Sequence, residues 1–255
     1  MKTVVSGFGR AGKECVLQLL KEGHSVSSFL IFTHDDKFNV EFIQFLKDFK
    51  FVYYTKSINK GVPELAEFKG DVLLSIYYKF IIKEEVIELF NGKAMNCHPS
   101  LLPDYKGCLS SVWAILNGES ETGISFHYII KGVDEGNIIL QKRVNILDED
   151  TAFSLYHKLL SVFVHNFIEA FNLLVQGYAG IDQSTMKGQR RYYSRSLPLQ
   201  GVLELESSSA AEVERFIKAM YCPPFAPAKF MMKGVAVDNS CLPAINSKYL
   251  KFMEV

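Results

Sequence analysis

The sequence predicts an α/β fold in which helices cover both faces of a mostly parallel sheet, followed by a small α+β subdomain at the C-terminal end. In the first hundred residues, short apolar runs alternate with segments of helical spacing, the rhythm of βαβ units. Several of these runs are apolar throughout, as in strands buried on both faces. Hydrophobic residues make up 48% and charged residues 22% of the 255-residue chain, which are globular values and exclude disorder for most of it.

The alternation begins at the N-terminus. Residues 3–6 are a short β-branched run that ends at Gly7, and the next segment places Cys15, Val16 and Leu19 on one helix face before Gly23. The same patterns recur to about residue 97. The expected strands lie at 3–6, 26–33, 51–54, 71–76 and 93–97, and the expected helices at 14–22, 41–49 and 83–90.

The rhythm changes after residue 100. Two extended segments, 123–130 and 137–146, are joined through KGVDEG, and Asp150 is a candidate N-cap for a long helix to about Gln176. After Gly180 the chain becomes polar and basic and then rich in proline, with one further helix expected near 211–220. We therefore expect a first domain over residues 1–180 and a small C-terminal subdomain over residues 181–255.

Charge and cysteine usage exclude several classes of protein. Lys and Arg total 28 and Asp and Glu total 28, so no global excess of cations is available to neutralise nucleic-acid phosphates. The five cysteines form no C-x-x-C pair and their number is odd, which argues against a disulfide framework or a structural zinc site. No stretch approaches the length of a membrane span and the start lacks a signal-peptide pattern, so we expect a cytoplasmic location.

A glycine-rich turn is the first candidate binding motif. Gly7, Gly9 and Gly12 have the G-x-G-x-x-G spacing between a strand and a helix, where backbone N–H groups can approach a phosphate. Asp35 follows the second strand, at the place of an acidic ribose ligand in a dinucleotide site. Three interpretations remain open: a dinucleotide site, a site for another phosphorylated ligand, and a tight turn that binds nothing.

The second candidate is MNCHPSLLPDYKG at residues 95–107, at the end of a predicted strand. Alternation along a strand points Asn96 and His98 to the same face, which places an amide donor beside an imidazole. The amide can stabilise a developing oxyanion and the imidazole can transfer a proton near neutral pH. A third motif, Val133-Asp134-Glu135-Gly136, is either an ordinary turn or, if the fold brings it to His98, the carboxylate that orients the imidazole.

The last two motifs together resemble the 10-formyltetrahydrofolate-dependent formyltransferase family. The pattern is N-x-H-P-S-L-L-P-x-Y-[RK]-G followed about 25 residues later by V-D-x-G-x-I-[IL], and the resemblance covers roughly residues 1–180. It implies a Rossmann-like catalytic domain, direct formyl transfer from 10-formyltetrahydrofolate to an amine, no metal, and a catalytic set of Asn96, His98 and Asp134. Lys106 stands where many members have arginine and lacks the bidentate fork of that residue.

The acceptor amine separates the members of this family, which act on methionyl-tRNA, on glycinamide ribonucleotide or on nucleotide-linked amino sugars. The neutral charge and the tail of about 75 residues argue against the tRNA enzyme, and the tail is too long for the purine enzyme. The tail motif RRYYSR-x-L-P is similar to sugar N-formyltransferases. The expected acceptor is GDP-perosamine or a related dTDP- or UDP-linked 3- or 4-amino-dideoxysugar. A methionyl-tRNA formyltransferase and, more remotely, an NAD-dependent oxidoreductase remain the alternatives.

The resemblance also implies binding residues and partners. The folate is expected to lie beside two segments, whose residues are Tyr77, Tyr78, Lys79, Phe80, Ile81, Ile130, Lys131, Gly132 and Val133. The sugar nucleotide is expected to contact Ser100, Tyr105, Lys106, Gly107, Gly9 and His34. The other histidines, including His127, are expected to be packing or surface groups. We further expect a bacterial homodimer that binds no nucleic acid and serves O-antigen or lipopolysaccharide biosynthesis.

Overall fold

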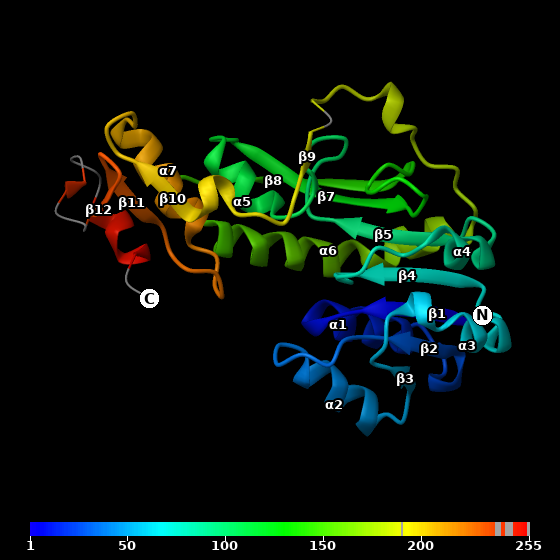
Figure 1. Cartoon of the computed structure of the whole chain (residues 1–255). Helices are drawn as coiled ribbons and strands as arrows, with labels where there is room; N and C mark the ends of the chain where they lie inside the picture. The colour runs from blue at the N-terminus through cyan, green and yellow to red at the C-terminus, as the bar shows by residue number, and fades with distance from the viewer. Residues whose placement is uncertain (190, 238–240, 243–246, 254–255) are drawn as a thin grey trace. The chain divides into compact units, whose positions relative to one another are not determined.

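A seven-stranded sheet with the order β3-β2-β1-β4-β5-β7-β8 dominates the computed structural model, which describes residues 1–189, 191–237, 241–242 and 247–253 (Figure 1). The strands are β1 (Thr3–Gly7), β2 (Phe29–Phe32), β3 (Val52–Tyr54), β4 (Val72–Ile76), β5 (Ala94–His98), β7 (Glu121–Tyr128) and β8 (Ile138–Asn145). The helices along the same part of the chain are α1 (Gly9–Lys21), α2 (Val40–Asp48), α3 (Val62–Phe68), α4 (Glu84–Ile87), α5 (Ser110–Leu116) and α6 (Ala152–Val175).

The sheet is mostly parallel, as predicted. Strand β1 pairs in parallel with β2 and β4, β2 pairs with β3, and β4 pairs with β5. The direction changes at β5, which pairs antiparallel with β7. The carboxyl ends of β1, β4 and β5 therefore meet at one edge of the sheet, where ligands of open α/β sheets collect.

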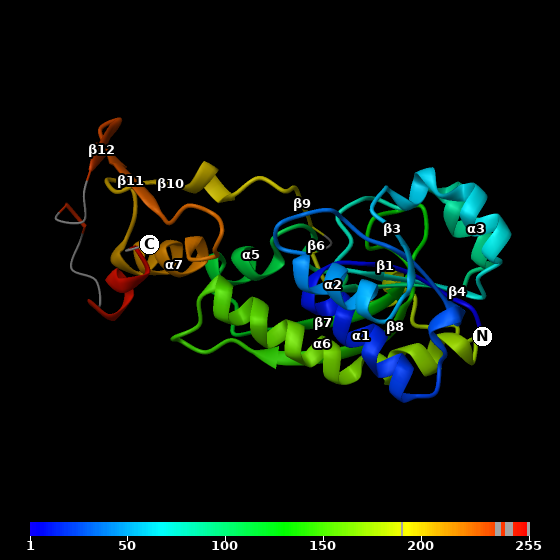
Figure 2. The same cartoon turned by 90° about the horizontal axis from the view of Figure 1, so that it is seen from below.

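Helices cover both faces of this sheet because its strands alternate apolar side chains between two layers. On one face, Val4 and Leu73 join a buried cluster with Leu65 of α3 and Val86 of α4. On the other face, Phe126 of β7 contacts Phe163 of α6, with ring centroids 5.4 Å apart. Helix α1 lies beside α6 on that second face, because the Gln18 side chain donates to the Val164 carbonyl at 2.8 Å (Figure 2).

The observed elements follow the predicted ones closely, with two helices missed. Helix α3 escapes a periodicity test because only Leu65 of its seven residues is buried. Helix α5 follows directly on the proline-rich motif, and its N-cap is Leu109 with a φ of 59°, so no ordinary capping residue marks its start. Helix α1 begins at Gly9 rather than at residue 14, since its first turn carries the two glycines that lower helix propensity.

The C-terminal region has the α+β composition that the sequence predicts. It contains the three-stranded sheet β10-β11-β12 (Val202–Glu204, Lys229–Met232 and Val235–Val237) and helix α7 (Ala210–Met220). A capping box starts α7, in which Ser209 and Glu212 bond reciprocally to each other's backbone N–H groups. The two-residue strands β6 (Lys106–Gly107) and β9 (Tyr192–Tyr193) also pair, in parallel.

The chain forms two compact units. The first contains Met1–His98, Ser125–Gln141 and Leu160–Lys187, and the second contains Pro99–Ile124, Lys142–Leu159 and Gly188–Val255. The two units alternate along the chain, and the division into domains at residue 180 stays a prediction.

Helix α6 is long and apolar enough to cross a membrane by length and composition alone. Many of its apolar residues are nevertheless buried in the protein, among them Leu155, Leu159, Phe163 and Phe167. This burial is that of a core helix, for which the length and composition test is weak evidence of a span.

Candidate active site

Four polar side chains line one face of the sheet where β5 runs beside β7. The antiparallel register pairs Asn96 with His127 and His98 with Ser125. Because alternate strand residues share a face, all four side chains lie together on it. His98, Ser125 and His127 are buried, while Asn96 is partly exposed. The sequence predicted the shared face of Asn96 and His98, and the register adds the two residues of β7.

Cys97 lies between these residues in sequence but points to the opposite face, with Phe126 as its cross-strand partner. Burial raises the pKa of the Cys97 thiol well above its usual value, and the charge of Asp134 raises this pKa further. A thiol held in its neutral form is a poor nucleophile. Cys97 is therefore a packing residue.

Asp134 lies in the loop between β7 and β8, and its backbone has a φ of 54°. Gly136 closes the loop against Tyr128, and a side chain at Gly136 would overlap the Tyr128 carbonyl oxygen. The loop also bonds back to the strand, since Tyr128 N–H donates to the Asn137 carbonyl at 3.0 Å. The glycine of the V-D-x-G motif is thus required by this close backbone approach.

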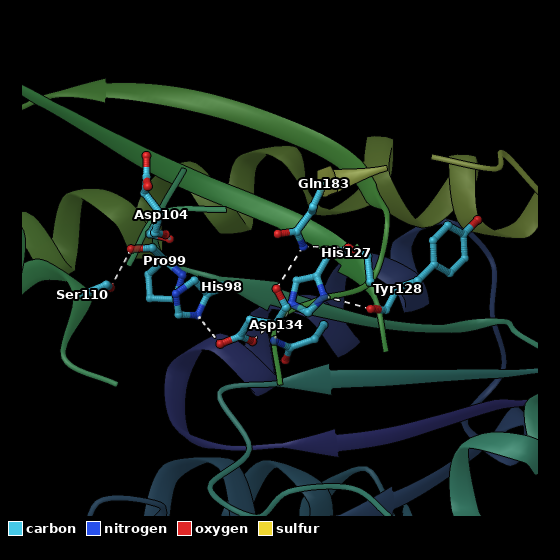
Figure 3. A network of polar contacts seen from close by, with 11 residues as sticks. His98, Pro99, Asp104, Ser110, His127, Tyr128, Asp134 and Gln183 are labelled. Atoms are coloured by element: carbon cyan, nitrogen blue, oxygen red, sulfur yellow. Dashed lines mark hydrogen bonds and ion pairs between the residues drawn. The ribbon is translucent and has the colours of Figure 1, made fainter. Parts of the chain in front are cut away.

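The Asp134 carboxylate lies between the two imidazoles (Figure 3). Its Oδ2 is 3.4 Å from His98 Nδ1, and its Oδ1 is 3.4 Å from His127 Nε2. Asp134 is only 9% exposed, so these interactions are weakly screened by solvent. The fold therefore brings the carboxylate of the third motif to the imidazole of the second.

The orientation of the Asn96 amide follows from the hydrogen bonds of His127. The His127 Nδ1 lies 2.9 Å from the Tyr128 carbonyl oxygen, which can only accept, so Nδ1 carries the proton. In the neutral ring, Nε2 is then an acceptor, and Asn96 Nδ2 lies 3.1 Å from it. One Asn96 N–H is accordingly donated to His127, which fixes the plane of the amide and the direction of its second N–H.

This arrangement has the parts of an acid–base site that stabilises an oxyanion. It combines an imidazole with a carboxylate at its Nδ1 and, two residues away on the same strand face, an amide donor. With Nδ1 of His98 turned to the carboxylate, Nε2 is the nitrogen suited to proton transfer. Among the residues that the structure describes, no group of three or more His, Cys, Asp or Glu side chains could hold a metal ion.

The two segments expected beside the folate lie close together. Lys131 Nζ, in the loop before Asp134, is 3.1 Å from Glu84 Oε2 at the start of α4, just after residues 77–81. Both segments carry exposed apolar side chains, which are Phe80, Ile81, Ile130 and Val133. Exposed apolar groups on adjacent segments fit a flat heteroaromatic ligand. Tyr77 packs on Phe163, and the Tyr78 hydroxyl accepts from the Ile58 backbone N–H, so these two rings also support the local structure.

His34 lies with the expected folate residues. Its ring stacks on Tyr78 with centroids 4.6 Å apart, and its Nε2 accepts from the Lys79 backbone N–H at 3.3 Å. Burial, together with the Lys79 ammonium, lowers the pKa of His34 to about 4. His34 is therefore neutral near pH 7, with an aromatic environment rather than an anionic one.

The Gly7–Gly12 turn is bonded internally. The Gly9 N–H donates to Asn39 Oδ1 at 2.7 Å, and the Phe8 and Gly12 N–H groups donate to the Ile76 and Phe8 carbonyls. A side chain at Gly12 would press on the ring of Phe42. These contacts favour the interpretation as a tight packing turn, because the amides of Phe8, Gly9 and Gly12 already have partners.

The other expected sugar-nucleotide residues lie in the second unit. Ser100 Oγ donates to the Asp104 carbonyl, and the Tyr105 hydroxyl donates to Glu119 at 2.6 Å. Burial, with the Glu119 bond, raises the pKa of the Tyr105 hydroxyl. Lys106 and Gly107 form strand β6 against Tyr192 and Tyr193, which belong to the tail motif RRYYSR. The pairing thus brings together two segments. One is expected to contact the sugar nucleotide, and the other belongs to the tail motif that is similar to sugar N-formyltransferases.

Sequence reasoning missed two residues of the site in the first unit. His127 was expected to be a packing group, and its cross-strand pairing with Asn96 has no signal in a single sequence. Gln183 donates to the Asp134 and Gly136 carbonyls at 2.9 and 2.8 Å. It lies in a polar segment without regular spacing, so no local pattern could have marked it.

Known proteins match most of the length of the chain. The formyl transferase family model covers residues 1–171. The GDP-perosamine N-formyltransferase of Brucella melitensis is 34% identical over 236 residues, which are 91% of this chain and 90% of that protein.

Solved structures show the same fold. The N-formyltransferase of Helicobacter canadensis, determined with folinic acid and dTDP-3-aminofucose, matches with a TM-score of 0.77 at 23% identity over 93% of this chain and 86% of that one. Glycinamide ribonucleotide transformylase 1 of Symbiobacterium toebii matches with a TM-score of 0.59 at 22% identity, covering 69% of this chain and 89% of that one. The chain, with its asparagine, histidine and aspartate brought together on one sheet edge, belongs to the formyl transferase family of enzymes.

Proposed function

We propose that this enzyme transfers the formyl group of 10-formyltetrahydrofolate to the amine of a nucleotide-linked amino-dideoxysugar, GDP-perosamine or a related dTDP- or UDP-linked 3- or 4-amino sugar. The observation that carries the chemistry is the Asp134 carboxylate within 3.4 Å of His98 Nδ1, beside Asn96. The acceptor class rests on the Brucella relative, which aligns over nearly the whole of both chains.

In this proposal His98 is the proton acceptor. An amine attacks the formyl carbon only when its nitrogen has a lone pair, and it must lose a proton as the new C–N bond forms. His98 takes that proton at Nε2, and Asp134 stabilises the resulting imidazolium through Nδ1. Asn96 donates its second N–H to the formyl oxygen, where negative charge develops.

The folate donor supplies the formyl group, and its amine leaves the tetrahedral intermediate with the proton that His98 has accepted. The residues suited to hold it are the apolar groups of segments 77–81 and 130–133, which the Lys131–Glu84 ion pair brings together. Ser100, Tyr105, Lys106 and Gly107 are assigned to the sugar nucleotide, together with Gly9 and His34. The internal bonding of Gly9 and the aromatic environment of His34 make the last two the weakest assignments.

The biological setting is part of the same proposal. A formylated amino sugar on a nucleotide carrier is a building block for O-antigen or lipopolysaccharide, which places the enzyme in the bacterial cytoplasm. We also propose a homodimer that involves the C-terminal region. Light scattering coupled to size exclusion tests this, and a mass of one chain would contradict it.

The decisive experiment incubates the enzyme and 10-formyltetrahydrofolate with a panel of nucleotide-linked amino sugars and reads the products by mass spectrometry. Gain of one formyl group identifies the acceptor, its nucleotide base and the position of its amine. The His98→Ala protein is the control and should give no product. Formylation of methionyl-tRNA but of no sugar in the panel would contradict the proposed acceptor class.

A further inference from the structure

The loop that carries Asp134 is attached to a segment about 50 residues further along the chain. Ile138 and Ile181 form an antiparallel bridge, with reciprocal N–H···O bonds of 2.8 Å. Asn137 Nδ2 donates to the Ala179 carbonyl at 3.0 Å, and the Tyr128 hydroxyl donates to the Tyr178 carbonyl. This pairing leads the chain along the loop until Gln183 lies next to Asp134.

Gln183 bonds to the backbone on both sides of Glu135. Its Nε2 donates to the Asp134 carbonyl at 2.9 Å and to the Gly136 carbonyl at 2.8 Å. The side chain is 5% exposed, so these bonds form in a water-poor environment. Figure 3 shows Gln183 and His98 approaching Asp134 from different directions, with dashed lines from Gln183 to the backbone of the loop. One side chain thereby holds the backbone carbonyls on both sides of Glu135, and the first of these belongs to Asp134 itself.

The backbone at Asp134 needs such support. A φ of 54° is unfavourable for a residue with a Cβ, and such conformations persist only where the surroundings hold them. The carboxylate must also stay near two imidazoles that lie on other elements, His98 on β5 and His127 on β7. A side chain that holds the Asp134 carbonyl restrains the rotation by which this residue would relax to an ordinary φ.

We propose that Gln183 is a positioning residue that holds Asp134 in the conformation in which its carboxylate faces His98 and His127. The inference rests on the proposed catalytic role of Asp134 for its effect on rate. Its effect on geometry can be measured without any substrate. The hydrogen bonds of Gln183 to the loop go to backbone carbonyls, so in this role it acts through Asp134.

The rate test is a double-mutant cycle. Gln183→Met keeps the length and apolar packing of the side chain but donates no hydrogen bond. We expect it to lower kcat about 30-fold with the native Asp134, and less than about 2-fold in an Asp134→Asn background, because the carboxylate that Gln183 positions is then absent. Equal losses in the two backgrounds would overturn the proposal, because a merely structural role lowers both rates alike.

The matched control is Asn137→Ala. This variant removes another hydrogen bond between the same two segments but leaves the Asp134 and Gly136 carbonyls bonded. We expect a smaller fall in Tm than that of Gln183→Met, because this bond is exposed whereas those of Gln183 are buried, and a kcat within about 2-fold of the parent. Loss of kcat in proportion to Tm in both variants would assign the bond a structural role only.

The substrate-free test uses the ¹⁵N resonances of the histidine rings, assigned with His98→Gln and His127→Gln. In the Gln183→Met protein, the ¹⁵N chemical shifts of the His98 and His127 rings should move toward the values measured in the Asp134→Asn protein. In the Asn137→Ala protein they should stay at the parent values. Unchanged shifts would overturn the proposal even if no acceptor sugar has been found. If the shifts move and no sugar is formylated, only the proposed substrate fails.

Discussion

Two glycine-containing turns of this protein carry sequence motifs of similar strength, and they differ in what their polar groups do. In the Gly7–Gly12 turn, the Gly9 N–H bonds to Asn39 and Gly12 makes room for Phe42. In the turn that ends at Gly136, the glycine makes room for a carbonyl, and Asp134 directs its carboxylate at two imidazoles. The first turn satisfies its own donors, whereas the second presents a charge to other elements. This difference, rather than the motif, separates a packing turn from a candidate catalytic turn.

The largest expected effect comes from neutralising the second turn. Asp134→Asn keeps the shape of the side chain but removes the charge that orients His98 and stabilises its protonated form. Since a positioned general base contributes about 100- to 10,000-fold, we expect kcat to fall about 1000-fold. The measurement is the rate of formyl transfer with both substrates saturating. Glu135→Gln, on the exposed neighbour in the same loop, is the matched control and should keep kcat. Similar losses in both variants would contradict a specific role of Asp134.

A smaller effect is expected at His127, which acts on the second turn from β7. His127→Phe keeps a buried ring but removes the acceptor for Asn96 Nδ2 and the partner of Asp134 Oδ1. The Asn96 amide can then rotate, and we expect kcat to fall about 10-fold, less than the loss of an oxyanion donor itself. Steady-state kinetics of the purified variant measure this. A rate equal to that of the parent protein would show that the strand alone orients Asn96.

The sequence predicted the chemistry of the second turn better than its supports. Strand alternation placed Asn96 and His98 on one face, and the resemblance to formyltransferases supplied Asp134. Neither could supply His127 or Gln183, because these residues depend on a cross-strand register and on a contact 49 residues away. The first turn shows the reverse situation: its spacing is compatible with a ligand, while Asn39, whose side chain bonds to the Gly9 amide, lies 30 residues further on. Local patterns predict elements and their faces, but tertiary pairing decides which polar groups already have partners.

The first turn can be tested through Asn39, which is fully buried and bonds to three groups. Its Oδ1 accepts from Gly9, and its Nδ2 donates to Thr33 Oγ1 and to the His34 carbonyl. Asn39→Ala leaves buried polar groups without partners, so we expect the free energy of unfolding to fall by about 1–3 kcal/mol while kcat stays near that of the parent protein. Denaturant unfolding and kinetics below the transition temperature measure the two effects. Gln44→Ala, which removes an exposed bond to Asp48, should change stability by less than about 0.5 kcal/mol. Loss of kcat without loss of stability in Asn39→Ala would return the turn to the candidate site.

The smallest expected effect concerns pH and His34, whose carbonyl Asn39 holds beside the first turn. Burial and the Lys79 ammonium lower the pKa of the folded His34 to about 4, although Asp36 opposes this shift, and an unfolded histidine has a pKa near 6.5. Between these values the unfolded chain binds more protons than the folded one, so the contribution of His34 to stability is complete above about pH 6.5 and is lost as the pH falls toward 4. His34→Gln offers an uncharged acceptor to the Lys79 N–H and does not titrate. We therefore expect Tm to fall more steeply between pH 6.5 and 4 in the parent protein than in this variant. Carboxylates that titrate in the same range contribute equally to both proteins, so parallel slopes would mean that His34 is protonated in the folded state as readily as in the unfolded chain.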